Sequence, residues 1–242
     1  MTTTVDEIAP DIFRISSFVA DFGIQLNQFL LRDEEPFLMH TGMRRMFPAT
    51  LEAVARVIDP ATLRWIGYSH FEPDECGALN EWLGVAPNAT PVTSPVGAMV
   101  MLGDFADRPA RALDDNETFS TGRHRLRFLS TPHLPHGWDA GLFHDEATGT
   151  LFCSDLFFHP GETEPLNRAD IVGPAVAAMN ASLEGPMAKD MPYTADTRPL
   201  LDRLAALKPK TLAIMHGASF GGDGAAALRD YADAVDTILG VR

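Results

Sequence analysis

The residues best suited to chemistry lie in the stretch HFEPDE, residues 70–75. It brings one imidazole and three carboxylates together directly after the apolar run Leu63–Tyr68, which is typical of a buried strand. Loops at strand ends place functional groups on a rigid sheet. Imidazole suits iron, zinc and copper, whereas carboxylates suit harder cations, so the mixture favours iron, manganese or zinc. The alternative is an acidic surface loop with an incidental histidine.

Three further ligand-type residues come at or just after the ends of other apolar runs. They are His136 after Arg125–Leu129, Asp155 after Leu151–Cys153 and His216 after Thr211–Met215. Taken alone, each has a plain structural explanation as a loop histidine, a turn or capping aspartate, or a hydrogen-bonded histidine. Four strand ends that all supply ligand residues are a rarer coincidence, and together they predict one metal site.

These spacings resemble the metallo-β-lactamase superfamily, and within it the di-iron branch found in flavodiiron proteins and in stand-alone oxygen-binding di-iron proteins. The motif H-x-E-x-D ends at Asp74; His136 follows it by 62 residues, Asp155 comes 19 residues later and His216 another 61 residues later. The resemblance spans nearly the whole chain and implies one domain over residues 1–242. It also implies an α/β (α+β) fold built as a four-layer αββα sandwich.

Glu72 restricts the resemblance to the di-iron branch, because hydrolases of the superfamily usually carry a second histidine at that position. A carboxylate is a harder ligand and stabilises ferric iron better than an imidazole does. The resemblance implies a first metal ion on His70, Glu72, His136 and Asp155, and a second on Asp74, Asp155 and His216. Asp155 would bridge the pair, and open positions would remain for water, oxygen or a bridging oxo group. The implied cofactor is two iron ions, with zinc or manganese as alternatives.

Three positions depart from the family pattern or compete within it. Glu75 stands where the motif continues with a histidine; it is either an oxygen ligand or a residue of a helix N-terminus, where the dipole favours a carboxylate. His40 stands where the superfamily has an aspartate, and it is a candidate to hydrogen-bond a ligand. His133 competes with His136, whose spacing to Asp155 fits better, and would otherwise line the pocket.

Other side chains near the motifs have weaker signals. The candidates for the pocket wall are Tyr68, Phe71, Phe157, Phe158 and Tyr193, with core packing favoured for the last. His124, His144 and His159 are expected on the surface or in turns, with the pocket mouth as an alternative for His159. Cys76 and Cys153 are expected to be small buried apolar residues rather than a redox pair.

The elements that must position these residues are strands in the first and middle parts of the chain and helices in the last. The predicted strands are Asp11–Ser16, Leu26–Leu31, Pro36–Met39, Leu63–Tyr68, Ala140–His144, Thr150–Cys153 and Thr211–Met215, with a hairpin over Thr118–Ser130. The predicted helices are Pro48–Ile58, Glu75–Leu83, Ala169–Leu183, Thr197–Leu207 and Gly224–Leu239, and Phe158–Arg168 is a loop. This order predicts two packed sheets with helices outside.

Composition excludes several classes of protein. The 242 residues include 19 Lys and Arg against 33 Asp and Glu, a net charge of −14, which disfavours nucleic acid and anionic membrane surfaces as partners. No apolar run is long enough for a membrane span, and the N-terminus does not look like a secretory signal. Two cysteines are too few for a disulfide framework, so a cytoplasmic protein is expected.

The leading hypothesis is a non-haem di-iron protein that binds or reduces a small diatomic molecule, most of all O2. The sequence does not decide whether it is an enzyme, although an oxidoreductase is favoured, with no catalytic residues beyond the metal centre. Because the chain ends soon after His216, no FMN domain is expected, and electrons would come from a separate donor protein. The resemblance implies a homodimer. The alternative is a zinc hydrolase acting on an ester, thioester, lactone or phosphodiester; a degraded site is a third hypothesis.

Overall fold

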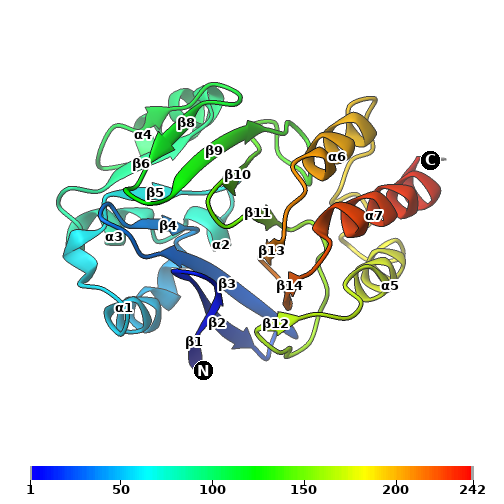
Figure 1. Cartoon of the computed structure of the whole chain (residues 1–242), viewed down its shortest axis with the longest axis horizontal. Helices are drawn as coiled ribbons and strands as arrows, with labels where there is room; N and C mark the ends of the chain where they lie inside the picture. Colours follow the sequence, from blue (N-terminus) through cyan, green and yellow to red (C-terminus); the bar gives the residue numbers. More distant parts are fainter. Residues whose placement is uncertain (1, 241–242) are drawn as a thin grey trace.

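The structure, a computed structural model, describes residues 2–240 and contains two seven-stranded sheets (Figure 1). The first sheet has the spatial order β1 (Thr3–Ala9), β2 (Ile12–Val19), β3 (Ile24–Leu31), β4 (Phe37–Met39), β5 (Trp65–Gly67), β6 (Thr90–Thr93) and β7 (Arg111–Ala112). The second has the order β12 (Leu166–Asn167), β14 (Ser219–Gly221), β13 (Thr211–Ile214), β11 (Thr150–Ser154), β10 (Gly141–Asp145), β9 (Arg125–Ser130) and β8 (Thr118–Ser120).

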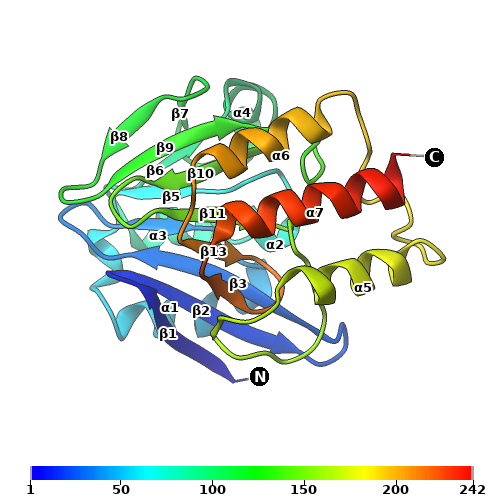
Figure 2. The same ribbon diagram turned by 45° about the vertical axis from the view of Figure 1, so that its right-hand side comes forward.

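Helices cover the outer face of each sheet (Figure 2). The first sheet is accompanied by α1 (Phe47–Ala55), α2 (Pro73–Cys76), α3 (Leu79–Val85), α4 (Leu102–Phe105) and the short turns η1 (Arg44–Met46), η2 (Pro60–Thr62) and η3 (Gly97–Met101). The second is covered by α5 (Val172–Ser182), α6 (Thr197–Ala206) and α7 (Gly224–Leu239). The predicted four-layer αββα sandwich is confirmed. Among the described helices, none has both the length and the hydrophobicity that crossing a bilayer requires.

The core between the two sheets is rich in phenylalanine. Phe37 of the first sheet lies 5.2 Å from Phe143 and 6.0 Å from Phe152 of the second, measured between ring centroids. Fully burying one such ring contributes about 1.5–3 kcal/mol. Because these rings come from both sheets, they fix the position of one sheet on the other.

Strand direction explains where a site can form. β4 and β5 are parallel neighbours in the first sheet, and β11 and β13 are parallel neighbours in the second. Parallel neighbours end at the same edge of a sheet, so the loops that follow them meet there. The two sheets pack face to face, so the edge where β5 ends and the edge where β11 and β13 end lie together. The residues after these three strands are therefore near one another although they are far apart in the chain.

The single helix predicted over Glu75–Leu83 is wrong, because two short helices, α2 and α3, occupy that region. The backbone amide of Thr41 donates to the carbonyl of Glu75 at 2.6 Å, and the amide of Ala78 donates to the carbonyl of Gly42 at 3.0 Å. The loop after β4 thus forms hydrogen bonds with backbone groups that a continuous helix would need for its own hydrogen bonds. These contacts hold α2, and with it the acidic motif, against the first sheet.

Three side chains differ from the sequence-based expectations. His124 and His144 are buried rather than on the surface, and the Nδ1 of His124 lies 3.0 Å from a carboxylate oxygen of Asp145. Tyr193 does not pack in the core: it is exposed, and its hydroxyl donates to Asp236 at 2.8 Å. None of the three reaches the predicted site. Cys76 and Cys153 are buried and free, as expected.

Candidate metal centre

The structure brings the six predicted ligand residues together at the edge where β5, β11 and β13 end. His70 comes three residues after β5, Asp155 directly after β11, and His216 two residues after β13. His136 lies in the loop between β9 and β10. The two remaining residues are Glu72, which precedes the first turn of α2 and caps no backbone amide, and Asp74 within it.

Asp155 lies at the middle of the cluster, with its two carboxylate oxygens facing different histidines. One oxygen is 3.4 Å from the Nε2 of His70 and 3.5 Å from the Nε2 of His136. The other is 3.1 Å from the Nε2 of His216. A carboxylate that presents one oxygen to each of two groups has the arrangement needed to bridge two cations.

The two outer carboxylates each belong to one side of Asp155. An oxygen of Glu72 lies 3.2 Å from the Nε2 of His136, and an oxygen of Asp74 lies 3.3 Å from the Nε2 of His216. The donor atoms therefore divide into two sets that share Asp155. Oxygen and imidazole nitrogen in this mixture suit iron, manganese or zinc.

Unpaired polar atoms gather at the same place. Within residues 2–240, five buried atoms of the cluster have no hydrogen-bond partner: the Nε2 of His70, both ring nitrogens of His136, Oδ1 of Asp155 and Oε2 of Glu75. Buried polar atoms are normally paired, because an unpaired one costs free energy. Nitrogen and oxygen atoms that face one another without hydrogen bonds are what metal ions would satisfy, so the residues present fit a metal pair.

The charges of the cluster explain why the pKa values of two of its histidines are raised. Burial lowers the pKa of His216, but Asp155 and Asp74 outweigh burial and raise it to about 10. Burial likewise lowers the pKa of His136, whereas Glu72, Asp155 and Asp190 together raise it to about 9. Acidic groups in excess thus draw protons onto these two histidines, whereas burial lowers the pKa of His70. A bound cation would take the place of those protons.

Hydrogen bonds behind the histidines direct their outer nitrogens into the cluster. The Nδ1 of His216 donates to the backbone carbonyl of Gln25 at 2.9 Å, which leaves Nε2 free to face Asp155. The Nδ1 of His70 lies 3.2 Å from the hydroxyl of Ser69, which in turn lies 3.1 Å from the Nε2 of His40. The hydroxyl of Ser69 therefore lies between His40 and His70. His40 thus supports a predicted ligand through Ser69, in agreement with its expected role as a hydrogen-bond partner.

Glu75 faces the cluster and not the solvent. Its side chain is only 1% exposed. One oxygen accepts hydrogen bonds from Ser69 and Ser154, both at 3.3 Å, and the other lies 3.2 Å from the Nε2 of His70. Burial and the neighbouring carboxylates raise the pKa of Glu75 well above its ordinary value. The carboxylate thus lies on the His70 side of Asp155.

Several pocket candidates lie elsewhere. His133 is exposed, with a left-handed φ of 63°, and its loop turns back at Gly137. Tyr68 is buried in the core beside the first sheet, where it packs on Phe71. His159 is buried, not at the pocket mouth: its Nε2 accepts a hydrogen bond from the amide of Ala218 at 2.9 Å, behind His216.

One of the aromatic candidates, Phe158, lies beside the centre, and Phe157 packs in the core. The ring of Phe158 is 5.6 Å from that of His216 and lines a neighbouring cavity. Phe157 is fully buried and stacks on Tyr231.

Sequence reasoning missed three supporting residues. Asp190 places an oxygen 3.5 Å from the Nδ1 of His136, and Ser69 and Ser154 hold Glu75. The two serines could have been found, because each directly precedes a ligand-type residue. No pattern marks Asp190, which lies in an irregular segment far along the chain.

Comparison with known proteins identifies the family. The family model described as "ODP family beta lactamase" matches residues 24–217. A putative diflavin flavoprotein A 1 from Nostoc sp. PCC 7120 is 35% identical over 147 residues, which cover 58% of this chain and 25% of that protein. The chain therefore spans about a quarter of that relative's length.

Solved structures show the same fold. The rubredoxin oxygen:oxidoreductase of Desulfovibrio gigas superposes with a TM-score of 0.80 at 20% identity, over 95% of this chain and 61% of that one. Residues 1–254 of putative diflavin flavoprotein A 5 from Nostoc sp. PCC 7120 give a TM-score of 0.80 at 19% identity, over 98% and 96%. At these identities the likeness concerns the fold alone.

Proposed function

The chain belongs to the ODP family of β-lactamase-like proteins, and from this premise we propose that it is a non-haem di-iron protein that binds or reduces a small diatomic molecule, O2 above all. One observation carries the proposal: two sets of donor atoms share Asp155, and one set includes the carboxylate of Glu72. A hard oxygen donor at this place favours iron, and it counts against the zinc-hydrolase alternative.

The proposed ligand set assigns four residues to the first iron and three to the second. His70, Glu72, His136 and Asp155 hold the first ion; Asp74, Asp155 and His216 hold the second. We add Glu75 to the first set, because its free oxygen lies 3.2 Å from the Nε2 of His70. Four carboxylates then match the charge of two divalent ions, and the histidines can stay neutral.

The protein supplies the geometry of this centre. When bound, a pair of ferrous ions supplies electrons and open coordination positions for a diatomic ligand. The carbonyl of Gln25 holds the neutral form of His216 with its Nε2 turned inward, and Ser69 orients His70. Phe158 packs against the ring of His216.

The relatives bear on substrate and electron supply. Diflavin flavoproteins are named for their flavins, and the D. gigas protein is named as an oxidoreductase of rubredoxin and oxygen. We propose that O2 is the ligand here as well, and that a separate donor protein delivers electrons. A homodimer is proposed on the same resemblance, and its mass in solution tests it.

Elemental analysis of protein purified from iron-sufficient cells tests the proposal. We expect about two irons per chain, an absorption band in air that bleaches with dithionite, and reoxidation of the reduced protein by O2. Two zincs per chain together with hydrolysis of an ester or phosphodiester would overturn the di-iron assignment. Protein that takes up neither metal after reconstitution with ferrous iron would overturn the metal centre itself.

A further inference from the structure

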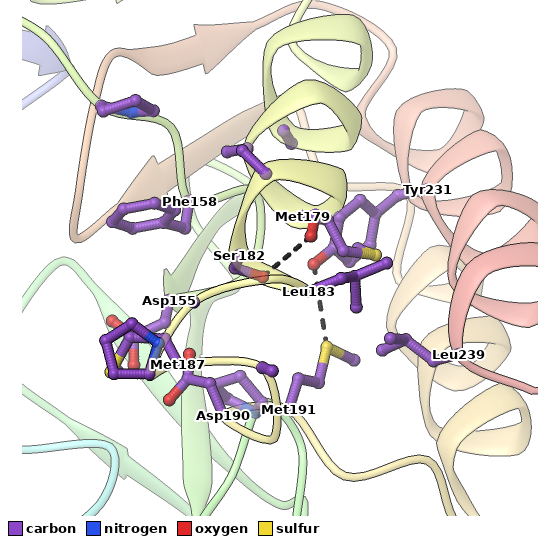
Figure 3. Close-up of a pocket in the computed structure, with 18 residues that line it drawn as sticks. Asp155, Phe158, Met179, Ser182, Leu183, Met187, Asp190, Met191, Tyr231 and Leu239 are labelled. Atoms are coloured by element: carbon purple, nitrogen blue, oxygen red, sulfur yellow. Dashed lines mark hydrogen bonds between the residues drawn. The ribbon is translucent and has the colours of Figure 1, made fainter. Parts of the chain in front are cut away.

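A cavity of about 420 Å³ adjoins the metal centre between α5, α7 and the segment 183–191 (Figure 3). Asp155 and Asp190 lie at one end of it, and Tyr231 and Leu239 lie at the other. Asp155 is the carboxylate that both donor sets share, and Asp190 contacts His136. The cavity therefore runs from the metal centre outward under the helices of the fourth layer.

The walls of the cavity are apolar. Alanines on α5 leave room, and methionines border it, namely Met179, Met187 and Met191. Methionine side chains are flexible and polarisable, so they adapt to ligands of different shape. The hydroxyl of Ser182 donates to the carbonyl of Met179 at 2.8 Å, so it is already paired. Little in the outer part of the cavity is left to bind a polar molecule.

The charges of the lining are of one sign. Among the residues that the structure describes, no lysine, arginine or histidine lines the cavity, and its two charged side chains are Asp155 and Asp190. Nothing in the wall would compensate an organic anion there, because burying an unpaired charge is costly. The apolar remainder of the lining does not compensate the desolvation of an organic cation either, so the occupant that suits these walls is uncharged.

The volume exceeds what a diatomic molecule needs. A water molecule occupies about 30 Å³ of liquid, and a dry cavity of roughly 150 Å³ is enough for benzene. At about 420 Å³ the cavity lies within the range typical of small-molecule sites, roughly 300–1,000 Å³. A store for O2 alone would not require this room.

We propose that this cavity binds an uncharged, apolar organic molecule of aromatic or aliphatic character, with one end against Asp155 and Asp190. The binding itself does not require iron. Its consequence for the centre rests on the proposed function: an occupant beside Asp155 lies next to the metal pair and shares space with its diatomic ligand.

A neutral fluorescent probe, N-phenyl-1-naphthylamine, tests the binding. We expect saturable fluorescence enhancement with the protein as purified. Ala178→Phe places a ring in the cavity and should weaken probe binding by about ten-fold or more, because the ring takes up space that the probe needs. Ala177→Phe is the matched control, since Ala177 lies on the same helix, is exposed and does not line the cavity; its affinity should stay within about two-fold.

A charged analogue separates a specific cavity from general stickiness. The probe 8-anilino-1-naphthalenesulfonate has the same ring skeleton plus a sulfonate, and the acidic end of the cavity should make it bind at least about ten-fold more weakly. Ala181→Trp, at an exposed lining position, repeats the blockade without touching the core, should Ala178→Phe fail to fold.

Four results would each overturn the proposal. They are fluorescence enhancement that does not saturate, an equal loss of probe affinity in Ala177→Phe, unchanged probe affinity in the variants that fill the cavity, and tighter binding of the sulfonate than of the neutral probe. Iron content is measured on the same samples. Probe binding without iron would leave this inference standing and remove the proposed function, and iron without probe binding would do the reverse.

Discussion

Asp155 holds the cluster together because each of its carboxylate oxygens faces a different histidine. Replacing it with asparagine keeps the shape but removes the negative charge, and only one oxygen remains. We expect Asp155→Asn to lower iron affinity by at least about ten-fold, measured by elemental analysis and by competition with a chelator. Asp104→Asn, at an exposed aspartate outside the cluster, is the control. Normal iron loading in Asp155→Asn would refute the bridging role.

Glu75 is fully buried beside His70, and a substitution there can separate a role as ligand from a supporting role. Glu75→Gln retains an oxygen that can accept from Ser69 and Ser154 but loses the charge. If Glu75 is a ligand, we expect about ten-fold weaker iron binding. Unchanged affinity in a chelator competition would show that Glu75 only supports His70.

The metal-free protein should respond to Glu75→Gln in the opposite direction. Since the pKa of Glu75 is raised on folding, its contribution to the free energy of unfolding is fully present below pH 4.5 and is lost as pH rises above that value. At neutral pH, Glu75→Gln should therefore stabilise the metal-free chain by about 1–3 kcal/mol. Urea unfolding at pH 4 and pH 7, after removal of metal, measures the difference. A loss of stability at pH 7 would contradict the burial argument.

At the scale of elements, the turn after β3 joins the two sheets far from the metal centre. Asp33 follows β3 and accepts hydrogen bonds from the hydroxyl of Thr121 and the amide of His124, both at 2.9 Å. Although burial alone would raise the pKa of Asp33, these donors lower it to about 2. The contact therefore depends on the ionised carboxylate.

Asp33→Ala should lower the free energy of unfolding by about 1–2 kcal/mol at pH 7. Because the folded pKa lies below the ordinary 3.8, the contribution is present above about pH 4 and disappears as pH falls toward 2. Denaturant titrations at several pH values measure the gap between wild type and variant. Glu34→Gln, at the exposed neighbour, is the control. A gap that stays constant down to pH 2 would contradict this role.

The loop after β13 depends on a glycine. Gly217 has a φ of +121°, and a Cβ there would lie 2.3 Å from the ring of His159. Gly217→Ala should displace this loop, lower stability by more than about 2 kcal/mol and weaken metal binding through His216. Gly84→Ala is the control, because nothing lies within 4 Å of its Cβ. Thermal unfolding and iron content together test the prediction, and wild-type values for both would refute it.

At the scale of the whole molecule, the metal centre joins the two halves of the sandwich. His70, Glu72 and Asp74 follow the first sheet, whereas Asp155 and His216 follow strands of the second. Removing iron with a chelator should lower the melting temperature by about 5–10 °C, as expected for a ligand that binds only the folded state. Readdition of ferrous iron should restore it. An unchanged melting temperature would show that the centre does not couple the sheets.

Local patterns in the sequence were enough for much of the fold. The apolar runs at Leu26–Leu31 and Thr211–Met215 and the amphipathic run at Gly224–Leu239 each predict an element that the structure confirms. These predictions depend on short-range periodicity, which neighbouring residues determine. β1 and β6 escaped prediction because their sequences are partly polar. β1 forms a strand by pairing with the adjacent β2, whereas β6 pairs with β5, which lies well before it in the chain.

Which residues form the candidate metal centre is a prediction from the sequence, because ligand chemistry depends on residue type and on position at strand ends. How these residues are arranged could not be predicted in the same way. Ser154, from a segment far along the chain, holds Glu75 in its orientation, and Asp190 likewise reaches His136 from a distant segment. The left-handed backbone at His133 belongs to a loop that turns away from the centre. The apolar cavity is the extreme case: residues from Pro135 to Leu239 line it. Such a space exists only once the helices have packed, so tertiary structure alone decides it.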